Sequence, residues 1–219
     1  MTSRTRAFPC ALALAAALLA MPALPLHAQL IRVPMPGAAA RPISASFAAG
    51  YLLTTGRFDG QSGMYWTLGD GIQYRGTVEL GTRSGAIGLT GTLANIPIRR
   101  GGVLGSDGDI TLRQLLATFR SPEGQTFYQV FEAGAGLSQW ASYSGTDALS
   151  ADEQKARTGV AIMIGYGFGF ALGDKMSFNV VQDASTIIGS GEGLPAGERR
   201  SQQQYITRMG LRYRFSGSR

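Results

Sequence analysis

Apolar residues recur at every second position along most of this chain, and this alternation limits the folds that it can adopt. The pattern is clearest near the end, where one set of alternate positions holds Tyr205, Thr207, Met209, Leu211, Tyr213 and Phe215. Small and basic residues occupy most of the positions between them. Successive side chains of a β-strand point to opposite faces, so a period of two indicates a strand with one apolar face. The sequence therefore predicts an all-β fold.

Eight stretches of the chain show this strand periodicity. They cover residues 42–53, 72–83, 86–96, 110–120, 125–137, 158–171, 175–184 and 203–215. A tilted strand needs about 9–11 residues to cross a bilayer, and most of these stretches are long enough. In the stretch 110–120, Arg113, Gln114 and Arg120 do not share one clean face, which leaves a β-bulge or a register error open there.

The connections between the stretches alternate in length. Long connections cover 54–71, 97–109, 138–157 and 185–202, and short ones lie around 84–85, 121–124 and 173–174. Outer-membrane barrels have short periplasmic turns and long outer loops, whereas a soluble sandwich has no reason to sort its loops by length. We therefore predict a closed antiparallel eight-stranded up-and-down transmembrane β-barrel in the outer membrane of a Gram-negative bacterium. An even number of strands leaves both ends of the chain in the periplasm.

The first residues have the pattern of a secretory signal. Arg4 and Arg6 precede an apolar segment over 11–26, and Ala28 offers a small residue at the expected cleavage position. A membrane anchor is the competing interpretation, but two prolines interrupt the short apolar segment. We expect residues 1–28 to be a signal peptide.

These boundaries divide the chain into four segments. We expect a signal peptide over 1–28, a periplasmic lead-in over 29–41, the barrel over 42–215 and a short C-terminal tail over 216–219. Removal of the signal takes away the only cysteine and the only histidine, Cys10 and His27, and lowers the formal charge from +6 to +4 because Arg4 and Arg6 leave. The remaining chain can form no disulfide.

Aromatic residues gather at both ends of the predicted strands. The periplasmic ends hold Phe119, Phe127, Tyr128, Phe170, Tyr213 and Phe215, and the outer ends hold Tyr51, Tyr74, Trp140 and Tyr205. Membrane barrels carry aromatic belts at their two interfaces with water, which this placement matches. Ordinary aromatic packing within a sheet is the alternative.

Several charged residues fall on the inward faces of the predicted strands. They are Arg75, Glu79, Glu132, Arg208 and Arg212, with Asn179 and Asp183 as further candidates. One interpretation is a network of ion pairs that plugs the barrel, since an unpaired buried ion is costly. The other is a charged constriction that filters solutes. An eight-stranded interior is just wide enough for side chains to fill, which favours the plug.

The terminal strand carries a resemblance to a known group of proteins. Residues 205–215 alternate and end in an aromatic residue, as in the small outer-membrane barrels that include the OmpA-type transmembrane domain, OmpX and the opacity-like proteins. The resemblance is one of pattern and covers roughly 42–215. It implies that Tyr213 and Phe215 belong to the signal read by barrel-assembly machinery, although the tail 216–219 departs from the pattern. It implies no catalytic residue.

The sequence offers little that points to an enzyme or a cofactor. Without a histidine after the signal, a Ser–His pairing is unavailable. The acidic pairs Asp59 and Asp70, and Asp147 and Asp152, are interpreted as solvated loop charges. The segment 107–109 lacks the spacing of a calcium loop and is interpreted as a turn.

The expected partners follow from the predicted location. They are outer-membrane lipid, lipopolysaccharide and the assembly machinery, with a monomer as the expected state. Arg99–Arg100 and Arg199–Arg200 give basic positions on outer loops that either contact lipopolysaccharide phosphates or only solubilise the loops. No basic groove interleaved with aromatics indicates nucleic-acid binding.

Three hypotheses for the role of the chain remain at this point. The first is a non-enzymatic barrel that supports envelope integrity or contacts external partners through four outer loops. The second is a narrow porin-like channel for ions or small solutes. The third is a soluble barrel of lipocalin type, which would turn its apolar face inward around a ligand.

Overall fold

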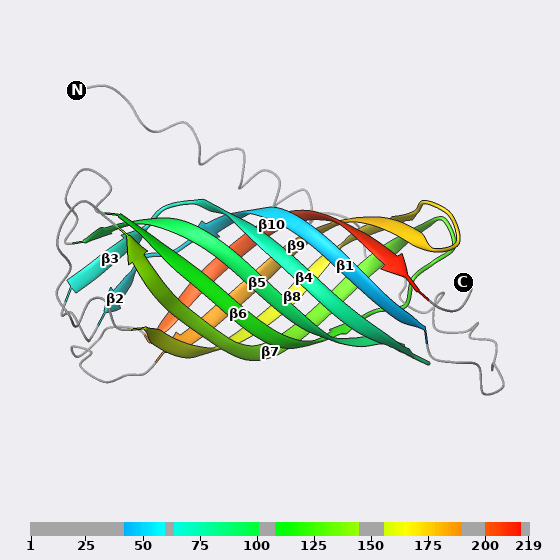
Figure 1. The fold of residues 1–219 in the computed structure, drawn as a ribbon, viewed down its shortest axis with the longest axis horizontal. Coiled ribbons are helices and arrows are strands. Elements are labelled where there is room, and N and C mark those ends of the chain that lie inside the picture. The colour runs from blue at the N-terminus through cyan, green and yellow to red at the C-terminus, as the bar shows by residue number, and fades with distance from the viewer. Residues whose placement is uncertain (1–41, 60–63, 101–107, 145–155, 190–199, 216–219) are drawn as a thin grey trace, which may run out of the picture. The chain divides into compact units, whose positions relative to one another are not determined.

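The computed structural model describes residues 42–59, 64–100, 108–144, 156–189 and 200–215 (Figure 1). Ten strands lie in these ranges: β1 (Ile43–Thr54), β2 (Arg57–Asp59), β3 (Met64–Leu68), β4 (Gly71–Thr82), β5 (Gly85–Arg100), β6 (Gly108–Arg120), β7 (Phe127–Ser144), β8 (Arg157–Ala171), β9 (Met176–Gly189) and β10 (Ser201–Arg214). Within the same ranges, no helix has the length and apolar character that a membrane-crossing helix requires. The predicted signal peptide, lead-in and tail lie outside the described residues.

Eight of the strands form a closed antiparallel barrel (Figure 1). Around the barrel they follow the chain in the order β1, β4, β5, β6, β7, β8, β9 and β10. The pairing of β10 with β1 closes the ring. Each of the eight predicted stretches corresponds to one of these strands, so the predicted fold class is confirmed.

The pairings also define the stagger of the strands. Followed from Phe178 on β9 across one partner after another, they return to β9 at Ile188, ten residues further along. A stagger of this kind accompanies strands that tilt by about 35–45° to the barrel axis. Because of the tilt, side chains that meet inside the barrel come from strands that are not direct partners.

The two ends of the barrel differ in their connections. Short turns over 83–84, 121–126 and 172–175 lie at one end, which we call the turn end. The longer connections lie at the other, which we call the loop end. The barrel strands extend further toward the loop end than predicted: β5 reaches Arg100, β7 reaches Ser144 and β9 reaches Gly189.

The connection over 54–71 was predicted as a loop, and this prediction was wrong. It contains the hairpin of β2 and β3, and β3 pairs with the end of β5 through Trp66 and Arg100. The segment is too short and too polar to show a clear period of two. Its strands form because the end of β5 extends past β4 and offers a partner.

The structure of β6 answers the question of a bulge or register error that the sequence left open in the stretch 110–120. This strand alternates without interruption, with Gln114 and Arg120 facing the lumen and Arg113 facing outward. The register shifts only near the loop end, between Asp109 and Thr111. The extra residue there belongs to β7, where Ser142 has a φ of 55°. The bulge that the sequence left open therefore lies in the neighbouring strand.

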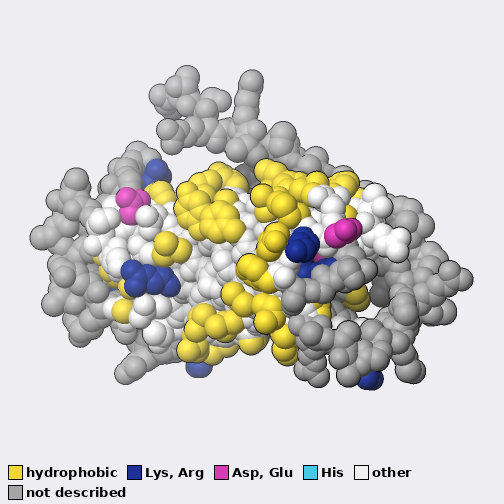
Figure 2. All heavy atoms as spheres, turned by 45° about the vertical axis from the view of Figure 1, so that its right-hand side comes forward, with side chains coloured by type: hydrophobic (Ala, Val, Ile, Leu, Met, Phe, Trp, Pro, Cys, Tyr) yellow, Lys and Arg dark blue, Asp and Glu magenta, His cyan; other side chains and the backbone are white. Residues whose placement is uncertain are grey.

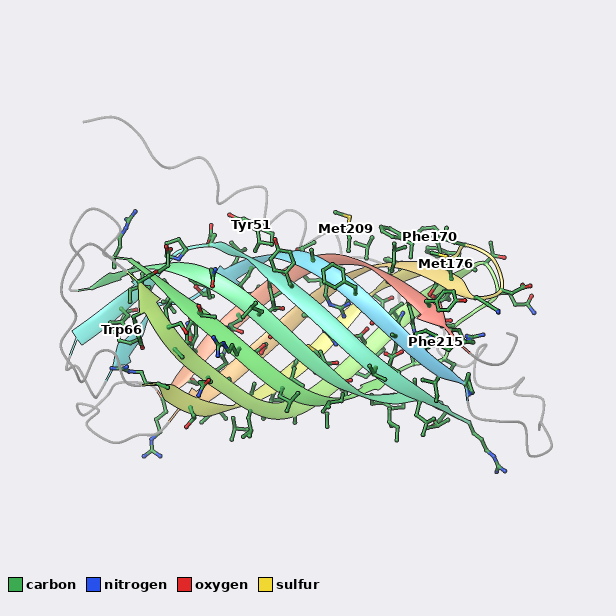
Figure 3. All side chains as sticks on the ribbon, in the orientation of Figure 1. Tyr51, Trp66, Phe170, Met176, Met209 and Phe215 are labelled. Carbon is green, nitrogen blue, oxygen red and sulfur yellow. The ribbon has the colours of Figure 1, made fainter. Side chains whose placement is uncertain are left out.

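The outer wall of the barrel is apolar (Figure 2). Exposed large side chains cover it on every barrel strand, and they include Phe47, Val78, Leu89, Leu115, Leu137, Ile164, Ile188 and Met209. In Figure 3, Tyr51, Met209 and Phe170 point away from the ribbon. This arrangement puts apolar groups where a soluble barrel of lipocalin type would put polar ones, and so it argues against that hypothesis.

Two residues of the predicted aromatic belts are not on the outer wall. Tyr128 and Trp140 point into the lumen and are only 3% and 1% exposed. Each lies at an even-numbered position of β7, and the even positions of this strand face inward over most of its length. The outward aromatics Tyr51, Tyr74 and Tyr205 lie toward the loop end as predicted.

Candidate functional site: the barrel lumen

Four charged side chains meet inside the barrel and alternate in sign. The carboxylate of Glu132 accepts from Arg75 Nη2 at 2.8 Å and from Arg208 Nη2 at 2.6 Å. Asp183 Oδ2 lies 2.6 Å from Arg208 Nε and 3.3 Å from Arg75 Nη1. These residues come from β4, β7, β9 and β10, so the cluster connects opposite sides of the barrel. All four are buried.

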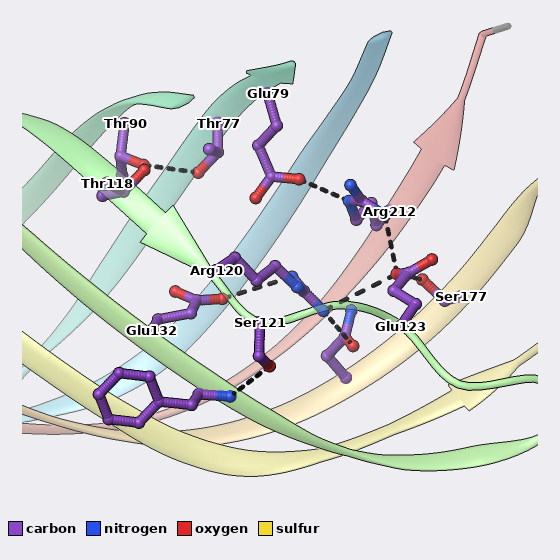
Figure 4. Close-up of polar contacts among 12 residues, drawn as sticks. Thr77, Glu79, Thr90, Thr118, Arg120, Ser121, Glu123, Glu132, Ser177 and Arg212 are labelled. Carbon is purple, nitrogen blue, oxygen red and sulfur yellow. Dashed lines mark hydrogen bonds and ion pairs between the residues drawn. The ribbon is translucent and has the colours of Figure 1, made fainter. Parts of the chain in front are cut away.

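A second group extends this cluster to the turn end (Figure 4). Arg120 on β6 donates from Nη1 to Glu132 Oε1 at 3.3 Å and from Nη2 to Asn179 Oδ1 at 2.6 Å. Arg212 Nε lies 2.5 Å from Glu79 Oε2. We call these side chains, together with the four above and Glu123, the ion network.

Glu123 joins the ion network from a turn rather than from a strand. Arg212 Nη1 and Arg214 Nη2 each lie 2.9 Å from one of its carboxylate oxygens. The hydroxyls of Ser177 and Tyr128 also donate to Oε1, at 2.8 and 3.0 Å. The turn over 121–126 is thereby tied to β7, β9 and β10 at the turn end.

Two opposing effects set the acidity of Glu123. Burial raises the pKa of its carboxyl, but the guanidinium groups of Arg212 and Arg120 and the hydroxyls of Ser177 and Tyr128 outweigh burial. The net result is a pKa below the ordinary value. Glu123 is therefore held as a carboxylate at neutral pH.

Glycines on β8 make room for the ion network. A Cβ added at Gly165 would lie 2.2 Å from Asp183 Oδ1, and one added at Gly169 would lie 2.4 Å from the ring of Tyr128. Three of the inward-facing glycines of β8 follow one another at alternate positions, Gly165, Gly167 and Gly169. Side chains that reach over the strand from β7 and β9 therefore account for Gly165 and Gly169, whereas a Cβ at Gly167 would meet the backbone of Val180.

The structure brings all five sequence-predicted lumen residues into the ion network. Arg75, Glu132 and Arg208 belong to its centre, and Glu79 and Arg212 form a pair beside it. Asp183 and Asn179, the further candidates, also take part.

Sequence reasoning missed two members of the network. The inward position of Arg120 follows from its even spacing to Gln114 and Thr118 on β6, so an unbroken alternation would have identified it. Glu123 lies in a turn, where periodicity says nothing about direction. No signal in the sequence would have placed it in the lumen.

Most buried side chains at the loop end of the lumen are apolar, which the sequence reasoning did not anticipate, although Arg157 and Gln202 are buried there as well. Its buried core is built from Leu52, Trp66, Leu68, Ala94, Ile96, Ile98, Ile110, Leu112, Leu116, Trp140, Ala161, Met163, Ile187 and Ile206. We call these residues the apolar cluster. Trp66 belongs to the β2–β3 hairpin, so this hairpin contributes a fully buried side chain to the interior of the barrel.

Trp66 also has an aromatic and a cationic neighbour. Its ring packs edge-on against Tyr143, with 5.5 Å between the centroids. The guanidinium of Arg157 lies 4.7 Å from the centroid of Trp66, within cation–π distance, and donates to the Tyr143 hydroxyl at 3.0 Å. These contacts join β3, β7 and β8 at the loop end.

The remaining sequence candidates are spread over the surface. Tyr213 and Phe215 face outward at the turn end, and their rings meet edge to face with 5.2 Å between the centroids. Asp70 accepts from the Tyr51 hydroxyl at 2.7 Å. The described part of the chain contains no group of three His, Cys, Asp or Glu side chains that could hold a metal ion. Asp107, Asp147, Asp152 and Arg199 lie outside the described residues, as do the side chains of Asp59 and Arg100.

Solved structures of other proteins resemble this barrel. The crystal structure of neisserial surface protein A covers 82% of this chain and all of its own length, with a TM-score of 0.50 and 10% identity. The outer membrane protein OprG from Pseudomonas aeruginosa covers 83% of this chain and 99% of its own, at a TM-score of 0.47 and 16% identity. No protein-family model and no curated protein matches the sequence. At this identity the likeness concerns the fold alone, and the chain has the fold of the small eight-stranded outer-membrane β-barrels.

Proposed function

We propose that this chain is a non-enzymatic protein of the Gram-negative outer membrane with a plugged lumen, which acts through its loop end. In this proposal the protein supports envelope integrity or contacts external partners. The observation that carries it is the filling of the lumen by the ion network and the apolar cluster.

The outer wall supports the membrane location. Large apolar side chains such as Phe47, Leu137 and Met209 are each about 60% exposed, with values of 61%, 66% and 61%. Exposure of so much apolar surface to water would be unfavourable, whereas exposure to lipid is not. The closed ring of strands also leaves no barrel edge with unpaired backbone groups, as a lipid environment requires.

The lumen supports a plug rather than a channel. A conducting pore needs a continuous polar path, and the apolar cluster lies across the loop end. At the turn end, the carboxylate of Glu123 is held by two arginines and two hydroxyls. A narrow channel for ions or small solutes is the alternative, and it would require both groups of contacts to open.

The proposed partners are outer-membrane lipid, lipopolysaccharide and the barrel-assembly machinery, with the protein as a monomer. Arg113 supports a contact with lipid phosphates, because it faces outward on β6 two residues beyond Leu115 and toward the loop end. A cation just past the apolar wall lies where anionic headgroups gather. The outward, edge-to-face pair of Tyr213 and Phe215 supports recognition of the terminal strand during assembly.

Conductance of the refolded protein tests the proposal. We expect no steady single-channel current from the protein in a planar bilayer in which a porin, added as the positive control, conducts. Insertion is checked separately by heat-dependent gel mobility and by protection of the barrel from protease. A steady, charge-selective current from inserted protein would overturn the plug and favour the channel.

A further inference from the structure

A row of hydrogen-bonded side chains crosses the lumen between the ion network and the loop end. Thr92 on β5 donates to Gln114 Oε1 at 3.0 Å, and Gln114 Nε2 lies 3.5 Å from Gln204 Oε1. Gln114 is on β6 and Gln204 is on β10, which are on opposite sides of the ring of eight strands. All three side chains are buried.

Other neutral polar side chains flank this row. Ser138 is the cross-strand partner of Gln114, and Ser185 is the cross-strand partner of Gln204. Gln73 on β4 lies two positions toward the loop end from Arg75, as Ser185 does from Asp183. Together these residues form a neutral polar layer, which consists of Gln73, Thr92, Gln114, Ser138, Ser185 and Gln204.

Four atoms of the neutral polar layer have no hydrogen-bond partner among the residues that the structure describes. They are Gln73 Nε2, Ser138 Oγ, Ser185 Oγ and Gln204 Nε2. Each of these side chains is at least 97% buried. Buried polar atoms in folded proteins almost always have a partner, which is either a protein group or an ordered water. Four exceptions in one layer indicate that the layer holds something besides protein.

Apolar side chains flank the layer on several strands, while on β10 the buried Gln202 follows Gln204 toward the loop end. Leu116 and Ile206 are the next inward residues toward the turn end on β6 and β10. Toward the loop end, Leu112, Trp140 and Ile187 follow Gln114, Ser138 and Ser185 on the same strands. On β4 and β9 the next inward residues toward the turn end are Arg75 and Asp183, whose charged groups already bond within the ion network.

The donors and acceptors of the neutral polar layer limit what can occupy it. Two amide nitrogens act only as donors, whereas the two serine hydroxyls both donate and accept. None of these groups is charged, so the layer offers no counter-charge to a bare ion. The occupant must be small, neutral, and able to donate and to accept.

We infer that the neutral polar layer binds a cluster of buried water molecules. The waters accept from the amide nitrogens of Gln73 and Gln204 and exchange hydrogen bonds with the hydroxyls of Ser138 and Ser185. Polar sites of this kind hold conserved internal waters in globular proteins. Because the layer is buried inside the closed barrel, these waters exchange slowly with bulk solvent. The inference rests on the closed lumen and names what that lumen contains.

Two serine substitutions test the water cluster. Ser138→Ala and Ser185→Ala each remove a hydroxyl that has no partner among the described protein groups. If waters occupy the layer, each loss deprives them of a partner, and the unfolding equilibrium constant in urea rises by about tenfold. If the layer is dry, removing an unsatisfied hydroxyl stabilises the fold, and the constant falls. Ser177→Ala is the control, because it removes a hydroxyl that donates directly to Glu123 and so shows the effect of losing one protein hydrogen bond.

Water itself is measured on the same proteins. Magnetic relaxation dispersion of ¹⁷O in micelles counts waters that stay inside the barrel for longer than bulk exchange allows. We expect such waters in the original protein and fewer in the double variant with Ser138→Ala and Ser185→Ala. An absence of long-lived waters, an unchanged count in the double variant, or an increase in its stability would each overturn the inference. A lumen that conducts would instead show ion current, which is the separate test of the plug.

Discussion

Arg208 on β10 and Glu132 on β7 form an ion pair inside the barrel, with 2.6 Å between Nη2 and Oε2 and both side chains at most 6% exposed. Two further strands, β8 and β9, lie between β7 and β10 in the ring. The pair therefore connects strands that share no backbone hydrogen bonds. Glu132 also accepts from Arg75 and Arg120, so its loss would leave three arginines short of an acceptor.

We expect Glu132→Gln to lower the free energy of unfolding by about 3–5 kcal/mol, because removal of one partner leaves buried charge uncompensated. Glu79→Gln should lower the free energy of unfolding by less, since Arg212 is its one ion-pair partner among the described residues and Arg212 keeps its contact with Glu123. Urea unfolding in micelles measures both. The double variant should still assemble, with reduced heat resistance on detergent gels. Unchanged heat resistance would contradict the assigned network.

The pH dependence of the free energy of unfolding should reflect the titration of the Glu123 carboxyl. Its pKa is lower in the folded state than the ordinary value of 4.5. The stabilisation from this carboxylate is therefore fully present above pH 4.5 and is lost as the pH falls through the folded-state pKa. Unfolding midpoints measured from pH 7 to pH 3 should decline below about pH 4.5. Glu123→Gln should be less stable at pH 7 and should show a shallower decline, and an equal slope in both proteins would count against this role.

The inward glycines of β8 should tolerate substitution poorly. Gly165→Ala should cost about 1–3 kcal/mol, because the new Cβ overlaps Asp183 Oδ1, which two arginines hold in place. Gly76→Ala is the matched control, since this strand glycine faces outward and its added Cβ would meet nothing within 4 Å. Comparable losses in the free energy of unfolding of the two variants would show that side chains around Gly165 pack less tightly than these distances indicate.

Trp66 should anchor the β2–β3 hairpin. Trp66→Ala should lower the free energy of unfolding by about 3–5 kcal/mol, since a buried aromatic leaves a cavity. Its neighbour Tyr65 provides the control, because Tyr65 is 47% exposed whereas Trp66 is 1% exposed. Tyr65→Ala should have a much smaller effect. Protease cleavage within the hairpin should also become faster in the Trp66 variant alone, and equal cleavage rates would refute the anchor.

The free-energy cost of a charged substitution should depend on its depth in the membrane. This dependence should reveal where the outer wall lies in the bilayer. Met209→Arg places a charge among apolar outward residues and should cost about 2–4 kcal/mol in vesicles. Gln203→Arg lies on the same face of β10, six residues nearer the loop end, and should cost about 0–1 kcal/mol. Refolding equilibria in lipid vesicles measure both. Equal costs would place the apolar wall outside the hydrocarbon.

Individual residues show which side-chain directions the alternating pattern predicts correctly. It assigned Arg75 and Arg208 to the lumen and Met209 to the outer wall, because in a barrel each position has only two directions. The same rule, applied consistently along β7, would have placed Tyr128 and Trp140 inside the barrel. Their assignment to the aromatic belts was wrong because it relied on residue type at strand ends instead of parity along the strand.

Other features depend on contacts between distant parts of the chain. The direction of Glu123 is set by Arg212 and Arg214, which lie about ninety residues away. Similarly, β3 exists as a strand because the end of β5 is available to pair with it. Neither relationship can be recognised from the local sequence.

The sequence by itself determined the number of barrel strands, the face of nearly every barrel-strand residue and the placement of short and long connections. These depend on a local rule, since successive side chains of a strand alternate whatever its neighbours are. The tertiary structure alone decided which inward residues meet. The ten-residue stagger tilts the strands and brings Arg75, Glu132 and Asp183 together while it sets Gln114 opposite Gln204. Such contacts depend on closure of the whole ring, which no single segment specifies.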